Sequence, residues 1–115
     1  MKFARVVCML AFMSLSALAY AHTHLVKAVP ADGSTVNAAP AKFVLTFNEA
    51  ARVTALSIQK GTEPAKKLGP LPETAAAEVS IAAPPLSAGK YVLSWRAVGD
   101  DGHVVPGKLT FTVGP

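Results

Sequence analysis

Hydrophobic residues recur at every second position along much of the chain. The clearest example is the segment 43–48, in which Phe43, Leu45 and Phe47 alternate with more polar neighbours. A period of two is typical of a β-strand that buries one face. Residues 53–59 repeat this pattern, and residues 91–98 form the run richest in aromatic and β-branched side chains. The pattern predicts short β-strands.

Proline and glycine separate these runs. Pro30 followed by Asp32 and Gly33 predicts a turn, and the Pro-rich residues 61–77 predict a loop or an edge ribbon. The alanines at 75–77 are too few, and too closely bounded by prolines, for a helix longer than one or two turns. Strands are expected at 25–29, 43–48, 53–59, 79–82, 91–98 and 109–113. Six or seven strands at this spacing predict an all-β Greek-key sandwich or barrel.

The first 21 residues have the pattern of a secretory signal peptide. Lys2 and Arg5 precede the uncharged apolar residues 6–18, and Ala19 and Ala21 form an A-x-A cleavage signal. The apolar run is shorter than the roughly 20 residues that cross a bilayer as a helix. We therefore expect residues 1–21 to be removed, leaving one domain at 22–115 with no membrane span. An overlapping A-x-A at 17–19 would instead leave Tyr20 first.

Composition narrows the class of the protein. Hydrophobic residues make up 51% and charged residues 16% of the 115 residues, which favours a folded domain over a disordered chain. Without Lys2 and Arg5, nine basic residues face seven acidic ones, and no basic cluster exceeds Lys66-Lys67. This balance excludes a nucleic-acid-binding surface, which needs a dense basic face. Residues 22–115 hold no Cys or Met, so no disulfide is expected.

His22 is the first candidate for metal chemistry. After cleavage at Ala21 it would carry a free α-amine and an imidazole on one residue. Such nitrogen donors suit Cu(II), Ni(II) and Zn(II), and the Irving–Williams order favours copper among divalent ions. Soft Cu(I) prefers sulfur ligands, which residues 22–115 lack. The alternative is a solvated chain terminus.

Asp101 and His103 are a second candidate. They are two residues apart, so in an extended segment they would project to the same side and face one ion. The alternative is an ordinary Asp-Gly turn with an exposed histidine. Glu49 ends a predicted strand and could add a carboxylate or orient a ligand histidine, or simply be a polar strand end.

His24 offers a competing arrangement. A free amine followed by His at the third position can wrap Cu(II) in a square plane through two deprotonated backbone amides. If residues 25–29 pair in a sheet, the nearby amides are committed to hydrogen bonds. His24 is then a neighbour of the site or a surface histidine.

Several motifs together give the sequence a resemblance to a known family. The motifs are His22 and Leu25 followed by residues 30–34 (PADGS), 45–49 (LTFNE), 85–91 (PLSAGKY), 91–98 (YVLSWRAV), 101–103 (DGH) and 107–113 (GKLTFTV). With them the chain resembles the CopC family of secreted copper-binding proteins over nearly all of residues 22–115.

The resemblance implies a cupredoxin-like or immunoglobulin-like β-sandwich. It also implies one Cu(II) ion held by the amino terminus and His22 with Asp101 and His103, and with Glu49 close by. Two-site members of the family carry a Met-rich loop for Cu(I). Residues 61–77 hold neither Met nor His here, so the chain is similar to the Cu(II)-only members.

The expected protein is thus a monomeric, periplasmic Cu(II) carrier that sequesters or buffers copper, or delivers it to a CopD-type membrane transporter, a partner suggested by the resemblance. One alternative is a copper monooxygenase, since an amino-terminal His with a second His also makes a histidine brace. A carboxylate beside His103 and the lack of long loops argue against an enzyme. The other alternative is a metal-free interaction module.

Overall fold

The computed structural model describes residues 22–115, so the leader predicted at 1–21 lies outside the described residues. The described chain consists of seven strands and no helix. They are β1 (Leu25–Val29), β2 (Ser34–Val36), β3 (Lys42–Lys60), β4 (Lys66–Lys67), β5 (Ala76–Ala82), β6 (Gly89–Gly99) and β7 (Val104–Val113). The prediction of an all-β sandwich or barrel with about seven strands is confirmed.

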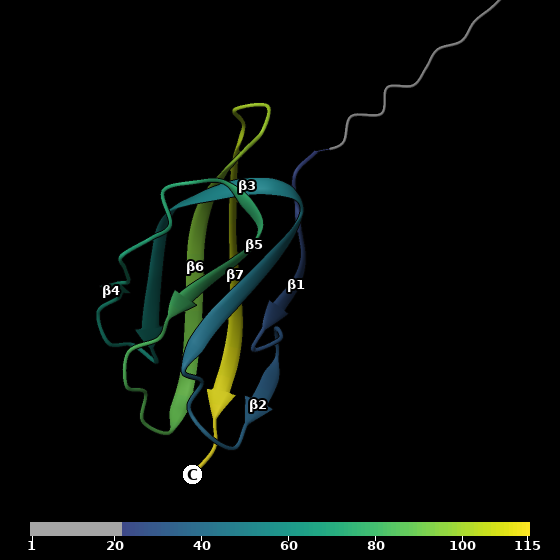
Figure 1. Ribbon diagram of the computed structural model, residues 1–115. Helices are drawn as coiled ribbons and strands as arrows, with labels where there is room; N and C mark the ends of the chain where they lie inside the picture. Colours follow the sequence, from purple (N-terminus) through teal and green to yellow (C-terminus); the bar gives the residue numbers. More distant parts are fainter. Residues whose placement is uncertain (1–21) are drawn as a thin grey trace, which may run out of the picture.

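β3 contributes to both layers of the sandwich. Its first half pairs with β1 on one side and β5 on the other, and its second half pairs with β6 and β4. In Figure 1 the strand rises in front of β6 and β7, bends at the top and descends at the left. The sequence predicts two strands, at 43–48 and 53–59, but the structure joins them into one. No Gly or Pro interrupts residues 43–59, so the chain bends without leaving the sheet.

The core lies between these two layers. Phe43, Leu45 and Phe47 are buried, as their alternation predicts. In the second half of β3 the inward positions change from Ala51 and Val53 to Leu56 and Ile58, and the other buried apolar residues are Val79, Ile81, Tyr91, Leu93, Trp95, Ala97, Leu109, Phe111 and Val113. The change occurs because the register with β6 shifts between Val53 and Ala55, and one extra residue reverses the face of every residue after it.

The turn after β1 is hydrogen-bonded to β7, a strand that does not pair with β1. Gly33, at φ 79°, donates its backbone N–H to the Thr110 carbonyl at 2.7 Å. The Asp32 carboxylate accepts the Thr110 N–H at 2.9 Å. These bonds set β2 parallel to β7 at the sheet edge. The turn predicted from Pro30, Asp32 and Gly33 therefore has a structural role.

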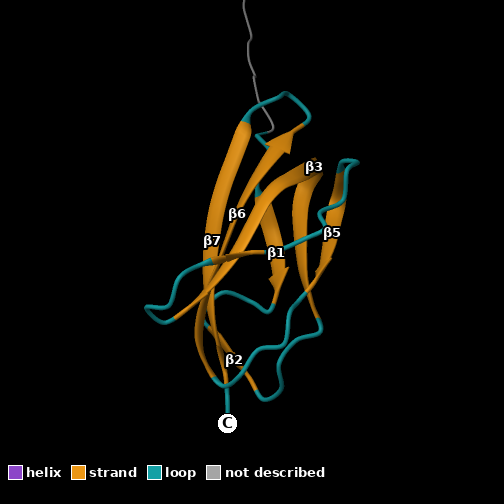
Figure 2. Cartoon of the chain, turned by 90° about the vertical axis from the view of Figure 1, so that its left-hand side faces the viewer, coloured by secondary structure: helices purple, strands orange, loops and turns teal. Residues whose placement is uncertain are grey.

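Three segments that are distant in sequence meet at one end of the molecule. The residues before β1, the bend of β3 and the turn between β6 and β7 all lie at the top in Figures 1 and 2. The opposite end carries the β2 segment and the carboxyl terminus. Over residues 22–115 we find no helix long and apolar enough to cross a membrane. The predicted metal-binding residues come from the three upper segments.

Candidate metal centre

Asp101 and His103 contact each other directly in the turn between β6 and β7. The His103 backbone N–H donates to Asp101 Oδ1 at 3.0 Å, and His103 Nδ1 lies 2.7 Å from Asp101 Oδ2. The two residues are not in an extended segment. Gly102 adopts φ 83°, and Gly99 closes the turn by donating to the His103 carbonyl and accepting from the Gly102 N–H, both at 3.0 Å. The turn, rather than strand periodicity, brings the two side chains together.

This contact determines which nitrogen of His103 is available. A carboxylate can only accept hydrogen bonds, so in the neutral imidazole Nδ1 carries the proton and Nε2 keeps its lone pair. The His103 side chain is 76% exposed and that of Asp101 45% exposed. The bond from the His103 backbone N–H, and after it the bond from the imidazole, lowers the pKa of Asp101 below its ordinary value. The lowered pKa favours the ionised carboxylate, and the contact with Asp101 leaves Nε2 of the exposed His103 ring with a lone pair that could bind a metal ion.

The segment that carries His22 is fastened to the bend of β3 by Asn48. Its Nδ2 donates to the His22 carbonyl at 3.1 Å, and its Oδ1 accepts the His24 backbone N–H at 2.7 Å. The Asn48 backbone N–H donates to the His24 carbonyl at 3.0 Å. One asparagine thus binds the main chain on both sides of Thr23.

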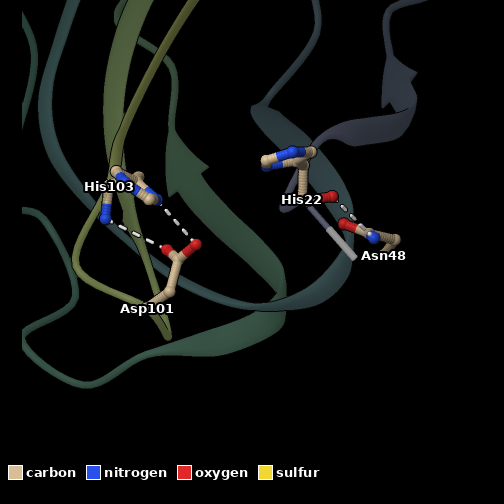
Figure 3. Close-up of polar contacts among 4 residues, drawn as sticks. All are labelled: His22, Asn48, Asp101 and His103. Carbon is tan, nitrogen blue, oxygen red and sulfur yellow. Dashed lines mark hydrogen bonds and ion pairs between the residues drawn. The ribbon is translucent and has the colours of Figure 1, made fainter. Parts of the chain in front are cut away.

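Thr23 lies against the base of the β6–β7 turn. It is 7% exposed, the buried polar residue of the described chain. A Cβ built on Gly99 would lie 2.4 Å from Thr23 Oγ1 and 3.3 Å from Asp101 Oδ1. Both side chains therefore lie next to Gly99. His22 is the residue directly before Thr23. In Figure 3 the His22 imidazole lies on the side of its segment that faces Asp101 and His103.

The remaining predicted residues are placed less closely. His24 Nδ1 lies 3.0 Å from the His22 carbonyl oxygen, so this ring nitrogen contacts the main chain. Glu49 is half-buried in the bend of β3, next to Asn48. Among residues 22–115, no three His, Cys, Asp or Glu side chains are gathered closely enough to hold a metal ion. The side chains of the described residues alone therefore do not form a metal cage.

Sequence reasoning did not identify Asn48, Thr23 and Gly99 as part of this region. Asn48 continues the alternation of the strand and looks like an ordinary outward residue. Its role depends on hydrogen bonds to His24 and His22, which precede it by 24 and 26 residues. A single sequence does not reveal such long-range contacts. The one local signal is a polar amide at the end of a strand, a group well suited to bonding exposed main chain.

Comparisons with known proteins agree with one another. A family model described as the CopC domain matches residues 25–114. Copper resistance protein C of Pseudomonas syringae pv. tomato is 38% identical over 111 residues, which cover 88% of this chain and 87% of that protein. Copper resistance protein C of Xanthomonas campestris pv. juglandis is 36% identical over 120 residues, covering 96% and 94%.

Two solved structures resemble the fold. The crystal structure of CopC from Methylosinus trichosporium OB3b has a TM-score of 0.71 and 32% identity, covering 82% of this chain and 95% of that one. PcoC, described as a methionine-rich copper resistance protein from Escherichia coli, has a TM-score of 0.60 and 32% identity, covering 81% and 99%.

Proposed function

Since this chain belongs to the CopC family, we propose that it is a secreted copper-binding protein that holds one Cu(II) ion at the end of the sandwich described above. The relatives are named as copper resistance proteins, which supports copper as the ion. The single observation that carries the proposal is the Asp101 and His103 pair, held beside the segment that begins at His22.

The proposed ligands come from two segments. His22 supplies its imidazole and, once residues 1–21 are removed, its α-amine. His103 supplies Nε2, because Asp101 occupies Nδ1. Each Asp101 oxygen accepts one hydrogen bond and keeps a further lone pair, so the carboxylate can also complete the coordination. In this proposal the α-amine adds a further donor to the three side chains.

The oxidation state follows from the donor atoms. Amine, imidazole and carboxylate donors suit Cu(II), whereas Cu(I) prefers thiolate and thioether. Residues 22–115 contain no sulfur, unlike the relative described as methionine-rich. We therefore expect competition with chelators of each oxidation state to show a strong preference for Cu(II), and comparable affinities for the two ions would contradict the proposed donor set.

His24 and Glu49 have subordinate roles in this proposal. A three-residue wrap of the amino terminus needs a deprotonated His24 amide, but that N–H donates to Asn48 Oδ1 at 2.7 Å. The wrap would have to break this bond and pull the segment from the sheet. Glu49 lies at the same end of the molecule and serves at most to orient a ligand.

We propose a carrier rather than an enzyme, because a carboxylate-completed site leaves copper little open coordination for oxygen. In this proposal the leader at 1–21 directs export and is then removed, and the domain at 22–115 sequesters or buffers copper in the periplasm as a monomer. Delivery to a CopD-type membrane transporter is the part of the proposal that the family resemblance alone suggests. Copper-dependent oxidation of polysaccharide above the rate of free copper would refute the carrier.

The decisive experiment changes the amine and no side chain. Protein that begins at His22 is compared with protein that carries one additional alanine before His22, and both are titrated with Cu(II). We expect the extended form to lose at least about 100-fold in affinity, because it loses a direct donor and not merely an outer contact, and to change its EPR parameters. Equal affinities would show that the amine is not a ligand.

A further inference from the structure

The segment before β1 is anchored at two points, although it precedes the first strand. Asn48 forms three hydrogen bonds with the main chain of His22 and His24, at 2.7, 3.0 and 3.1 Å. Between these bonds, Thr23 is buried against Gly99. We call this arrangement the Asn48 clamp: Asn48 with Thr23 and Gly99.

The two anchors belong to the two parts that the site must join. Asn48 is in the bend of β3, and Gly99 is the last residue of β6, directly before the turn that holds Asp101. Gly99 also bonds His103 and Gly102 through its backbone. The Thr23 contact therefore rests on the residue that closes the Asp101 and His103 turn.

We propose that Asn48 is a positioning residue that holds the His22 segment against the Asp101 and His103 turn before copper binds. The effect of the clamp on copper binding rests on the proposed function, whereas the hydrogen bonds and packing of the clamp do not. Chain termini are poorly ordered unless they are tied down, and ordering them on binding costs affinity. The clamp orders the main chain of this segment during folding, so less of that cost remains when copper binds. Asn48 does not touch the metal in this proposal.

Glycine is required at position 99 by the same packing. A Cβ at Gly99 would lie 2.4 Å from Thr23 Oγ1 and 2.9 Å from Thr23 Cβ. Gly99→Ala should therefore push Thr23 away without touching Asn48. Because the added Cβ would also lie 3.3 Å from Asp101 Oδ1, Asn48→Ala is the cleaner test of the clamp. Gly69→Ala is a matched control, because the only atom near its added Cβ is Leu71 N at 3.6 Å.

The first measurement needs no copper. In processed protein that begins at His22, hydrogen exchange of the His24 amide is followed by NMR. We expect Asn48→Ala to accelerate this exchange by about tenfold, since the N–H loses its acceptor. Asn37, an exposed asparagine directly after β2 at the opposite end of the molecule, is the control, and Asn37→Ala should leave the exchange unchanged. Exchange equally slow in Asn48→Ala and wild type would overturn the clamp, whatever copper does.

The second measurement tests positioning. Asn48→Ala and Gly99→Ala should each weaken Cu(II) binding by about 10–100-fold, as the loss of an outer-shell contact typically does, and alter the EPR spectrum of the bound ion. Asn37→Ala and Gly69→Ala should do neither. If Asn48→Ala and Gly99→Ala lower only the melting temperature, and the affinity and EPR spectrum stay those of wild type, the clamp is structural and the proposal fails.

The two failures remain distinguishable. If the wild type itself binds no copper, the proposed function fails, while the His24 exchange still decides the clamp. If one of the two variants does not fold, the other tests the same segment from the opposite anchor.

Discussion

The chain contains two Asp-Gly turns whose glycines have nearly the same φ, but whose aspartates bind different partners. Gly33 and Gly102 have φ values of 79° and 83°, and neither has an atom within 4 Å of a built Cβ. In the first turn Asp32 accepts the backbone N–H of Thr110, 78 residues away. In the second, Asp101 accepts from the backbone and imidazole of His103, two residues away.

The two turns differ in the group that each aspartate carboxylate binds. Asp32 joins two parts of the main chain and fixes the β2 edge against β7. Asp101 fixes a side chain that is mostly exposed and contributes little to packing. A hydrogen bond that orients an exposed imidazole contributes little to the fold, and it supports the proposed copper site. Asp32 should thus affect stability and Asp101 should affect metal binding.

The largest effect on copper affinity is expected in the second turn, from the loss of His103. His103→Ala should weaken Cu(II) binding by about 100-fold or more, because it removes a proposed ligand. Loss of a residue that only supports a ligand typically costs about 10–100-fold. The melting temperature of the copper-free protein should change little, since the side chain is exposed. Parallel Cu(II) titrations and thermal melts check this, and unchanged affinity would make the second turn as structural as the first.

The reverse pattern is expected for the first turn. Asp32→Ala removes the acceptor of the Thr110 N–H and should cost about 1 kcal/mol, which lowers the melting temperature of a domain of this size by about 4–8 °C. Asp32→Asn keeps a carbonyl oxygen in place and should cost less. Copper affinity should stay that of wild type in both, and a loss of affinity would mean that the two turns are coupled.

Substituting the glycines makes the comparison sharper. Gly33→Ala and Gly102→Ala should each cost about 1 kcal/mol, the strain of placing an L-residue in the left-handed region, because no steric clash adds to it. Only Gly102→Ala should also weaken copper binding, since the same strain distorts the Asp101 and His103 contact. Denaturant melts and Cu(II) titrations of the two variants test this, and equal copper affinity in both would argue against a preset turn.

The comparison also marks how far the sequence can be interpreted. Alternation predicts the strands, and Pro30 with Asp32 and Gly33 predicts the first turn, because both signals are local. Residues 101–103 equally allow an extended pair or a turn, and the structure has the turn. The continuity of β3 and the shift of buried positions after Val53 depend on pairing with β6. Asn48 escapes prediction for the same reason, since its partners precede it by more than 20 residues.

The smallest expected effect concerns the protonation of Asp101. Its pKa is lowered first by the bond from the His103 backbone N–H and second by the bond from the imidazole. The folded state therefore holds fewer protons than the unfolded state near the ordinary pKa, so this stabilising contribution is present above that pKa and is lost as pH falls through the lowered folded value. The contribution to stability is small because the group is exposed.

An NMR titration of the Asp101 carboxyl carbon measures this shift directly in the copper-free protein. His103→Ala removes the imidazole bond but keeps the backbone N–H, which is the first cause of the shift. The pKa of Asp101 should therefore stay below its ordinary value in His103→Ala, although higher than in the wild type. A return to the ordinary value would mean that the imidazole alone sets the charge of Asp101, and that the turn does not preset the carboxylate independently of His103.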